Sequence, residues 1–224
     1  MSIHSKTQEL LRKTLPLIDQ QEYAKIYHTI VSDSHYNAFD GEYTQCLLAV
    51  GLDPLKNSSQ IYPYYLCRSD IKEFVVPDHI NIIEESAFDA CQSLHSISLP
   101  ENLSNIGEFA FSDCFSLNQI NIPDNVHVIG RGAFMGSAIT SLVLPSKLKV
   151  ISAHLCDDCA FLESIVIPRA IEKIDVKIFW DSSKLNKLIY NGTKMEWNTI
   201  PKAGNWKRED HKINLICKDG RFEI

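Results

Sequence analysis

A pattern of hydrophobic and polar positions recurs along the middle of the chain, and a proline marks each recurrence. The prolines are Pro77, Pro100, Pro123, Pro145 and Pro168. They follow one another at intervals of 23, 23, 22 and 23 residues. Two of the recurring phrases, AFDACQSLHSISLP at residues 87–100 and AFSDCFSLNQINIP at residues 110–123, are nearly identical. A fixed period of this length predicts a repeat protein in which each unit forms one turn of a solenoid.

Each unit carries the same series of side chains between one proline and the next. Aliphatic residues stand three and six places after the proline, and an Ala-Phe pair, a small residue and Leu-x-x-Ile-x-Leu follow. The pair is Ala87-Phe88, Ala110-Phe111 or Ala133-Phe134, then Leu155-Cys156 and Ile178-Phe179. The small residue is Cys91, Cys114, Cys159 or Ser182. One residue is missing from the third unit, and we place the deletion in its MGSAIT turn.

The segment before each proline predicts a short strand. In SISLP, Ile97 and Leu99 alternate with Ser96 and Ser98, so the aliphatic side chains face a core and the serines face outward. The proline ends the strand because it has no N–H to give to a ladder. Stacked units therefore predict a parallel sheet, in which each unit covers the apolar side of its neighbour.

This pattern resembles the BspA-like (Treponema pallidum type) leucine-rich repeats, whose motif is I-x-x-x-A-F-x-x-C-x-x-L-x-x-I-x-L-P. The resemblance covers about residues 64–191, or some five units. It implies a leucine-rich repeat solenoid, an α/β repeat with short parallel strands, that is used for recognition and has no catalytic residues. The fourth and fifth units depart from the Ala-Phe rule.

The two ends of the array differ from the repeats, and we predict that they act as caps. Residues 1–63 form an α-helical N-terminal cap or small domain, and Tyr64-Tyr65 occupies the Ala-Phe register of a degenerate first unit. Residues 192–224 form a small C-terminal cap with a helix at residues 194–200, a strand at HKINLIC and a turn at KDG. In this cap we expect Trp197 and Trp206 to cover the core of the last coil.

Charge and composition narrow the location and the class of partner. The net charge is −6, with acidic and basic residues interspersed, which argues against a nucleic acid as partner. The N-terminal sequence lacks the apolar core of a secretory signal, and no apolar run approaches the roughly 20 residues of a membrane span. The seven cysteines are an odd number, so we expect reduced, mostly buried thiols in a cytoplasmic protein with no membrane partner.

Searches for catalytic and metal-binding patterns give no consistent site. Cys156 and Cys159 form one CxxC pair, but a structural zinc site needs four ligands, and Cys159 already belongs to the repeat. The eight histidines show no ligand spacing, and the glycine-rich nucleotide motifs and the GxSxG elbow are missing from the sequence. We predict no metal, no cofactor and no enzymatic activity.

The outward positions of the strands are the candidate binding site. Glu73 and Val75 begin two columns that continue from coil to coil. The predicted partner-binding residues are Ser96, Ser98, Gln119, Asn121, Ser141, Val143, Ser164, Val166, Lys187 and Ile189. The centre of this surface is small and neutral, and its C-terminal part is apolar, which is typical of a contact site. The alternative is a plain surface of residues with high β-propensity.

The sequence thus favours a non-enzymatic module that binds another protein through its repeat surface. An alternative is a phage- or bacterium-encoded inhibitor that docks on and blocks a host enzyme, such as a defence factor. A cell-surface adhesin would require export, and an enzyme would have to lie within residues 1–63. The sequence leaves open whether the chain forms homo-oligomers.

Overall fold

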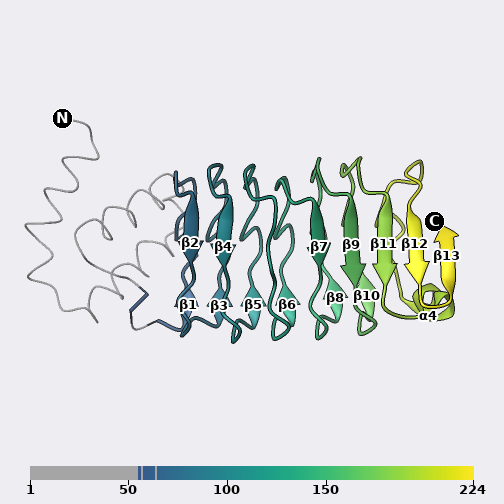
Figure 1. Ribbon diagram of the computed structural model, residues 1–224, viewed down its shortest axis with the longest axis horizontal. Helices are drawn as coiled ribbons and strands as arrows, with labels where there is room; N and C mark the ends of the chain where they lie inside the picture. Colours follow the sequence, from purple (N-terminus) through teal and green to yellow (C-terminus); the bar gives the residue numbers. More distant parts are fainter. Residues whose placement is uncertain (1–54, 57, 64) are drawn as a thin grey trace, which may run out of the picture.

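A computed structural model describes residues 55–56, 58–63 and 65–224 of the chain. These residues form a β-solenoid of about seven turns with parallel strands (Figure 1). The helices expected within residues 1–54 lie outside the described residues. One hydrophobic cluster runs through the solenoid from Leu55 to Cys217. The stacked coils therefore share a single continuous core.

The first ladder of strands contains the segments before the prolines. Its strands are β2 (Glu73–Val75), β4 (Ser96–Ser98), β7 (Ser141–Val143), β9 (Ser164–Ile167), β11 (Lys187–Tyr190), β12 (Asn214–Cys217) and β13 (Gly220–Glu223). The strands β2 and β4 pair with each other, and the other five form a sheet in the order β13-β12-β11-β9-β7. All of these pairs are parallel except β12 with β13. The parallel sheet expected from the alternating residues is therefore present.

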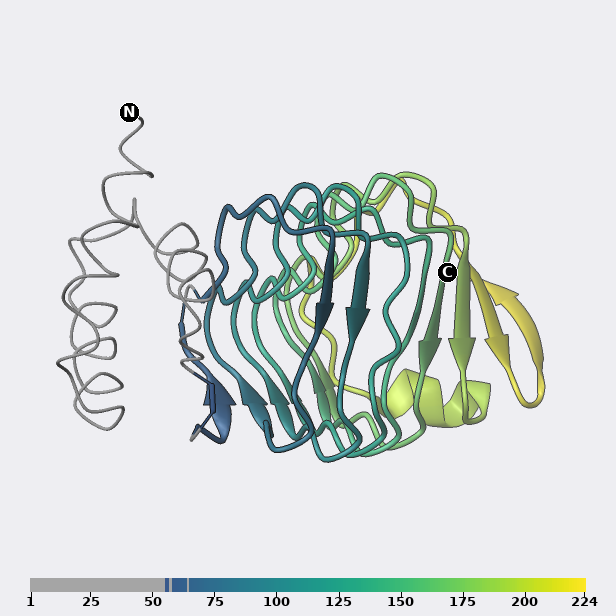
Figure 2. The same cartoon turned by 60° about the vertical axis from the view of Figure 1, so that its left-hand side comes forward.

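A second ladder lies on another side of each coil and was not expected (Figure 2). Its strands are β1 (Gln60–Ile61), β3 (Ile82–Ile83), β5 (Asn105–Ile106), β6 (Val128–Ile129), β8 (Val150–Ile151) and β10 (Lys173–Ile174). Each strand has only two residues, and from β3 onward the second is the aliphatic residue six places after the proline, which points into the core. The strand β1 pairs with β3, so the ladder begins at Gln60, before the predicted start of the repeats at residue 64.

The repeats in the described part of the chain contain turns in place of helices, which corrects the expectation of an α/β repeat. The backbone explains the difference. Ser86 and Ala90 have φ angles of 52° and 53°, and the equivalent residues of the next three coils share this left-handed conformation, while the last repeat has it at Lys177 alone. Two such residues four places apart interrupt any right-handed helix. The repeat is therefore all β, and the helix α4 (Lys194–Thr199) lies beyond it.

Each proline follows a strand, or in the case of Pro123 an extended segment, and begins the next turn. Its carbonyl accepts a hydrogen bond from the amide of the aliphatic residue three places later. The N···O distances are 3.0 Å for Ile80, Leu103 and Val126, 3.1 Å for Leu148 and 3.3 Å for Ile171. These aliphatic residues are buried. The recurring proline thus directs the next aliphatic side chain into the core by means of a β-turn.

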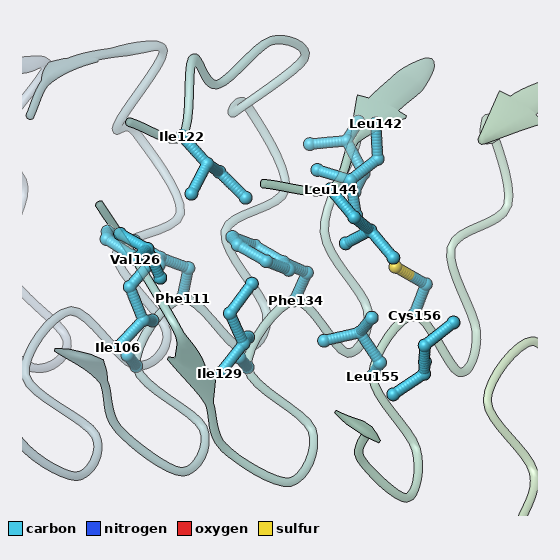
Figure 3. Packing of buried hydrophobic residues seen from close by; sticks show 14 of the residues in the cluster. Ile106, Phe111, Ile122, Val126, Ile129, Phe134, Leu142, Leu144, Leu155 and Cys156 are labelled. Atoms are coloured by element: carbon cyan, nitrogen blue, oxygen red, sulfur yellow. The ribbon is translucent and has the colours of Figure 1, made fainter. Parts of the chain in front are cut away.

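The phenylalanines of the repeat stack along the solenoid (Figure 3). The ring centroids of Phe88 and Phe111 are 5.3 Å apart and those of Phe111 and Phe134 are 5.7 Å apart, with interplanar angles of 5° in both pairs. The column ends where Cys156 replaces the next phenylalanine. Leu144 and Cys156 both belong to the core (Figure 3). Identical residues at identical positions therefore pack on one another from coil to coil.

The first degenerate unit is in register with the phenylalanine column, but one residue later than expected. The amide of Leu66 donates to the carbonyl of Ala87, as the amide of Phe88 donates to the carbonyl of Ala110. Leu66 is therefore the equivalent of Phe88, and Tyr65-Leu66 occupies the Ala-Phe register. The expectation of Tyr64-Tyr65 was wrong because the aromatic side chain was taken as the marker of the register.

The small residue of each unit forms a second buried column. The Sγ–H groups of Cys91, Cys114 and Cys159 donate to the carbonyls of Leu66, Phe88 and Phe134 in the preceding coil, at 2.9, 3.2 and 3.0 Å. The Oγ–H group of Ser182 donates to the carbonyl of Cys156 at 2.6 Å. These three cysteines are free thiols, as expected. The column provides a donor for a carbonyl that is buried between coils.

The C-terminal cap contains the expected helix and the expected strand. Thr193 and Glu196 form a capping box at the start of α4, and Trp197 is buried against Tyr190, with ring centroids 5.3 Å apart. Trp206 contacts Phe179 at 6.3 Å and Trp197 at 6.0 Å. The two tryptophans therefore cover the last coil, as expected. The strand β13, which pairs antiparallel with β12, was not expected.

The phenylalanine column gives a first prediction, because its members fill the core. Phe111→Ala removes a fully buried ring that contacts rings on both sides, so it should lower the free energy of unfolding by about 3–5 kcal/mol. Phe115→Ala is the matched control, since 55% of Phe115 is exposed, and should cost less than about 1 kcal/mol. Urea denaturation measures both. Equal losses would contradict the register of the column.

The thiol column gives a second prediction, because burial raises the pKa of Cys91 from its ordinary value of 9.0 to about 11. The unfolded chain releases this proton first as the pH rises. The contribution of Cys91 to stability is therefore complete below about pH 9 and is lost toward pH 11. Cys91→Ser keeps a donor, as Ser182 does, and does not titrate in this range.

The free energy of unfolding of the wild-type protein, minus that of Cys91→Ser, should decrease between about pH 8 and pH 11. Denaturant titrations at several pH values measure this difference. A difference that stays constant over this range would show that Cys91 is not protected by burial.

Candidate partner-binding surface

The alternation of each strand in the first ladder creates one outward-facing surface. In β7 the side chain of Leu142 is buried, while Ser141 and Val143 on either side of it are exposed. The same alternation holds in β2 and β4. We call the outward residues of this ladder the outward strip. It comprises Glu73, Val75, Ser96, Ser98, Gln119, Asn121, Ser141, Val143, Ser164, Val166, Lys187 and Ile189.

Strand register brings most of the outward strip together. In the five-stranded sheet, Ser141 lies beside Ser164, and Ser164 beside Lys187. The second column is Val143, Val166 and Ile189 in the same register. In the other sheet, Glu73 pairs with Ser96 and Val75 with Ser98. Neighbouring strands lie about 4.8 Å apart, so adjacent members of each column are in contact range.

The ladder is interrupted at residues 119–122, just before Pro123, which corrects the expectation of one unbroken sheet. Gln119 and Asn121 are exposed, as expected, but they lie outside the strands. Within the described part of the chain, the backbone of residues 119–122 makes no backbone hydrogen bond to a neighbouring coil. The alternation survives because it requires only an extended backbone, whereas a ladder requires each amide to face a carbonyl. The outward strip therefore has two blocks of strands with an exposed, unpaired segment between them.

Two further strands extend the surface beyond the residues found in the sequence. Asn214 continues the column of Lys187, and Ile216 continues the column of Ile189. On β13, Glu223 lies beside Asn214 and Arg221 beside Ile216. The alternation in INLIC was the signal for the first pair. No signal pointed to the second pair, because the antiparallel return of the chain follows a short turn.

Aliphatic and aromatic side chains are exposed on and beside the outward strip. Val75 is 74% exposed and Val143 is 61% exposed. Phe115 and Phe161 are 55% and 51% exposed. Phe115 precedes Gln119 by four residues, and Phe161 precedes Ser164 by three. The ammonium group of Lys184 lies 4.8 Å from the ring centroid of Phe161. Sequence reasoning missed these phenylalanines, because it searched for anchors only within the strands.

The CxxC pair is part of the core. Cys156 and Cys159 are buried, and burial raises the pKa of the Cys156 thiol well above its usual value. His154 is close to this segment but contacts Asp157, with 2.8 Å between Nδ1 and Oδ2. Among the described residues, no group of three or more His, Cys, Asp and Glu side chains is arranged to hold a metal ion.

Two hollows of about 300 and 550 Å³ lie beside Trp180 and share Arg208 and Asp210 in their walls. The Arg208 guanidinium donates two hydrogen bonds of 3.0 Å to Asp210 and one of 3.3 Å to Asp181. Arg208 holds the pKa of Asp210 below its usual value. The charged side chains therefore pair with one another, and they do not form an acid, a base and a nucleophile around a common point.

The described part of the chain contains no helix that is long and apolar enough to cross a membrane.

Comparison with known proteins identifies the repeat. A family model described as BspA type Leucine rich repeat region matches residues 59–186 in six copies. The crystal structure of the Treponema pallidum leucine-rich repeat protein is similar, with 27% identity and a TM-score of 0.54. The match covers 58% of this chain and 61% of that one. The chain therefore spans about three fifths of the length of the T. pallidum protein. No curated protein is significantly similar to the chain.

Two other solved structures resemble the chain less closely in sequence. The pneumococcal vaccine antigen PcpA is 19% identical, with a TM-score of 0.51, and the match covers 73% of this chain and 45% of that one. A leucine rich cell surface protein from Faecalibacterium prausnitzii A2-165 is 20% identical, with a TM-score of 0.46. That match covers 64% of this chain and 54% of that one.

Proposed function

The chain belongs to the BspA-type leucine-rich repeat family, and we propose that it is a non-enzymatic module that binds another protein through the outward strip. Repeats of this family are generally non-catalytic and typically bind proteins. The observation that carries the proposal is a row of aliphatic side chains in register on the outward face, of which Val143 is exposed and Val166 and Ile189 are half-buried. Val143 is 61% exposed and lies beside Val166, which lies beside Ile189.

The chemistry of the outward strip suits a protein partner. Its central residues are small and neutral, so the backbone of a partner can approach closely without burying an unpaired charge. Three adjacent aliphatic side chains then offer apolar area at one end, and contiguous apolar area on a polar surface is typical of contact sites. Glu73 and Lys187 place opposite charges at separate points along one column. This arrangement favours one orientation of the partner.

Phe115 and Phe161 supply the aromatic anchors that the strands themselves lack. Both rings are more than half exposed, although phenylalanine normally gains free energy from burial. Interfaces obtain much of their binding energy from a few large side chains that become buried on association. In this proposal the two rings lie at the margin of the contact and the outward strip forms its centre.

The finer parts of the proposal concern location and partner. We place the protein in the cytoplasm, because Cys91, Cys114 and Cys159 act as hydrogen-bond donors and must be reduced to do so. The cap predicted from the sequence of residues 1–63 would serve as a second contact. A host enzyme is one partner that a rigid surface of this kind can block, and the identity of the captured protein tests that alternative. Detection of the native protein outside the cell would instead favour an adhesin.

The third prediction compares two valine substitutions on different ladders. Val143 lies in the outward strip, whereas Val150 lies in the second ladder and is 39% exposed. Each change to Arg should alter the free energy of unfolding by less than about 0.5 kcal/mol, because both side chains are at the surface. Val143→Arg should abolish capture of a partner from a bacterial lysate, and Val150→Arg should leave capture unchanged.

The captured protein is identified by mass spectrometry, and its binding to both variants is then measured with the purified partner. Loss of binding with Val150→Arg but not with Val143→Arg would place the site on the second ladder. Equal binding of wild type and both variants would remove it from both ladders. Lack of any stable protein partner would contradict the proposed function itself.

A further inference from the structure

The five-stranded sheet ends in an open edge at β13. This strand pairs with β12 on one side only and is outermost in the sheet (Figure 2). An unpaired edge strand presents a row of amides and carbonyls that can bind another strand. In the five-stranded sheet, β9, β11 and β12 each have a neighbour on both sides, whereas no described strand lies beyond β13.

The pairing with β12 decides which backbone groups of β13 point outward. Ile213 and Ile224 exchange both of their backbone hydrogen bonds, at 3.0 Å each. Hydrogen-bonded and non-hydrogen-bonded pairs alternate along an antiparallel ladder. Phe222 therefore directs its N–H and C=O groups toward β12, while Arg221 and Glu223 direct theirs toward the open edge.

The two outward-directed residues carry opposite charges and lie on one face of the strand. Arg221 and Glu223 are both exposed, and Glu223 contacts Lys212 of its own chain, with 3.0 Å between Nζ and Oε1. Within the described part of the chain, Arg221 makes no ion pair. Phe222 lies on the opposite face and packs against the core. The edge therefore offers two hydrogen-bonding residues whose side chains are complementary to each other.

This order of residues is complementary to itself. Two copies of β13 that run antiparallel about a two-fold axis through Phe222 place Arg221 of each copy beside Glu223 of the other. Both of these pairs are the closely hydrogen-bonded kind, because their backbone groups already point outward. We propose that the protein forms a symmetric homodimer by pairing β13 with β13 of a second copy.

The dimer would gain four backbone hydrogen bonds and two cross-strand ion pairs. It would also join the outward strips of the two copies, since Arg221 and Glu223 continue the two columns of each strip. The proposal does not depend on the proposed function, because it concerns the edge of the sheet and not its outward face. A contact of this size is small, so we expect a dissociation constant on the order of 10–100 µM.

Charge reversal on the full chain provides the test. In a dimer of Arg221→Glu, the glutamate introduced into each copy faces Glu223 of the other, and in a dimer of Glu223→Arg, two arginines face each other. Opposite-charge pairs across strands stabilise and like-charge pairs destabilise by roughly 0.2–1 kcal/mol each. Both attractive pairs become repulsive in each single variant, so each should dimerise at least about fourfold more weakly. In an equal mixture, a heterodimer can form. In it, Glu223 of the Arg221→Glu copy faces Arg221 of the Glu223→Arg copy, and the two substituted residues face each other.

In that mixture, one strand carries two acidic residues and the other carries two basic residues, so both cross-strand pairs are attractive. The heterodimer should therefore form about as tightly as the wild-type dimer. Recovery in the mixture excludes misfolding as the cause of the loss in the single variants.

Analytical ultracentrifugation over a concentration series measures the dissociation constants, and native mass spectrometry distinguishes the heterodimer from the homodimers. A wild type that is monomeric up to roughly 100 µM, the upper end of the range expected for so small a contact, would overturn the proposal. Single variants that dimerise as tightly as the wild type, or a mixture that stays monomeric, would overturn it as well.

Discussion

Each coil of the solenoid can bury its apolar side chains and satisfy its backbone only through the coils beside it. A unit of 23 residues has two short strands and too little apolar surface to form a core alone. Stacking supplies what one unit lacks. The ring of Phe111 lies between those of Phe88 and Phe134, and the thiol of Cys114 bonds a carbonyl of the preceding coil. The period of the sequence is the direct consequence of this dependence on neighbours.

The same constraint explains what the sequence could predict. A column in the core requires the same kind of residue in every unit, so Phe88, Cys91 and Pro100 recur visibly and reveal the register. The two-residue strands were missed, because so short a segment shows no alternation that distinguishes it from a turn. The left-handed residues were missed for a different reason. Glycine occupies both left-handed positions in one coil, as Gly132 and Gly136. Other coils adopt a positive φ there with residues such as Ala90, which give no such signal.

The surface is less predictable than the core, because it depends on hydrogen bonds that no side-chain pattern records. The exposure of Gln119 and Asn121 follows from alternation and was predicted, but their failure to join the ladder was not. The edge at β13 is a similar case. Its pairing depends on a tight return of the chain at residues 218–219, and Arg221 and Glu223 resemble ordinary surface charges until the strand is placed. Sequence repeats therefore predict columns well and predict interruptions and ends poorly.

The ladders of the described residues arrange their side chains differently from a catalytic cleft. Side chains at equivalent positions of parallel coils point in the same direction and lie about 4.8 Å apart along the column. Catalysis requires different groups to converge on one reacting atom, which an array of parallel side chains does not provide. A partner that is itself extended can instead contact many coils at once, and each contact adds to the others without the need for a cleft. A regular ladder with exposed valines is therefore suited to recognition, and the same regularity that builds its core makes its surface broad and nearly uniform.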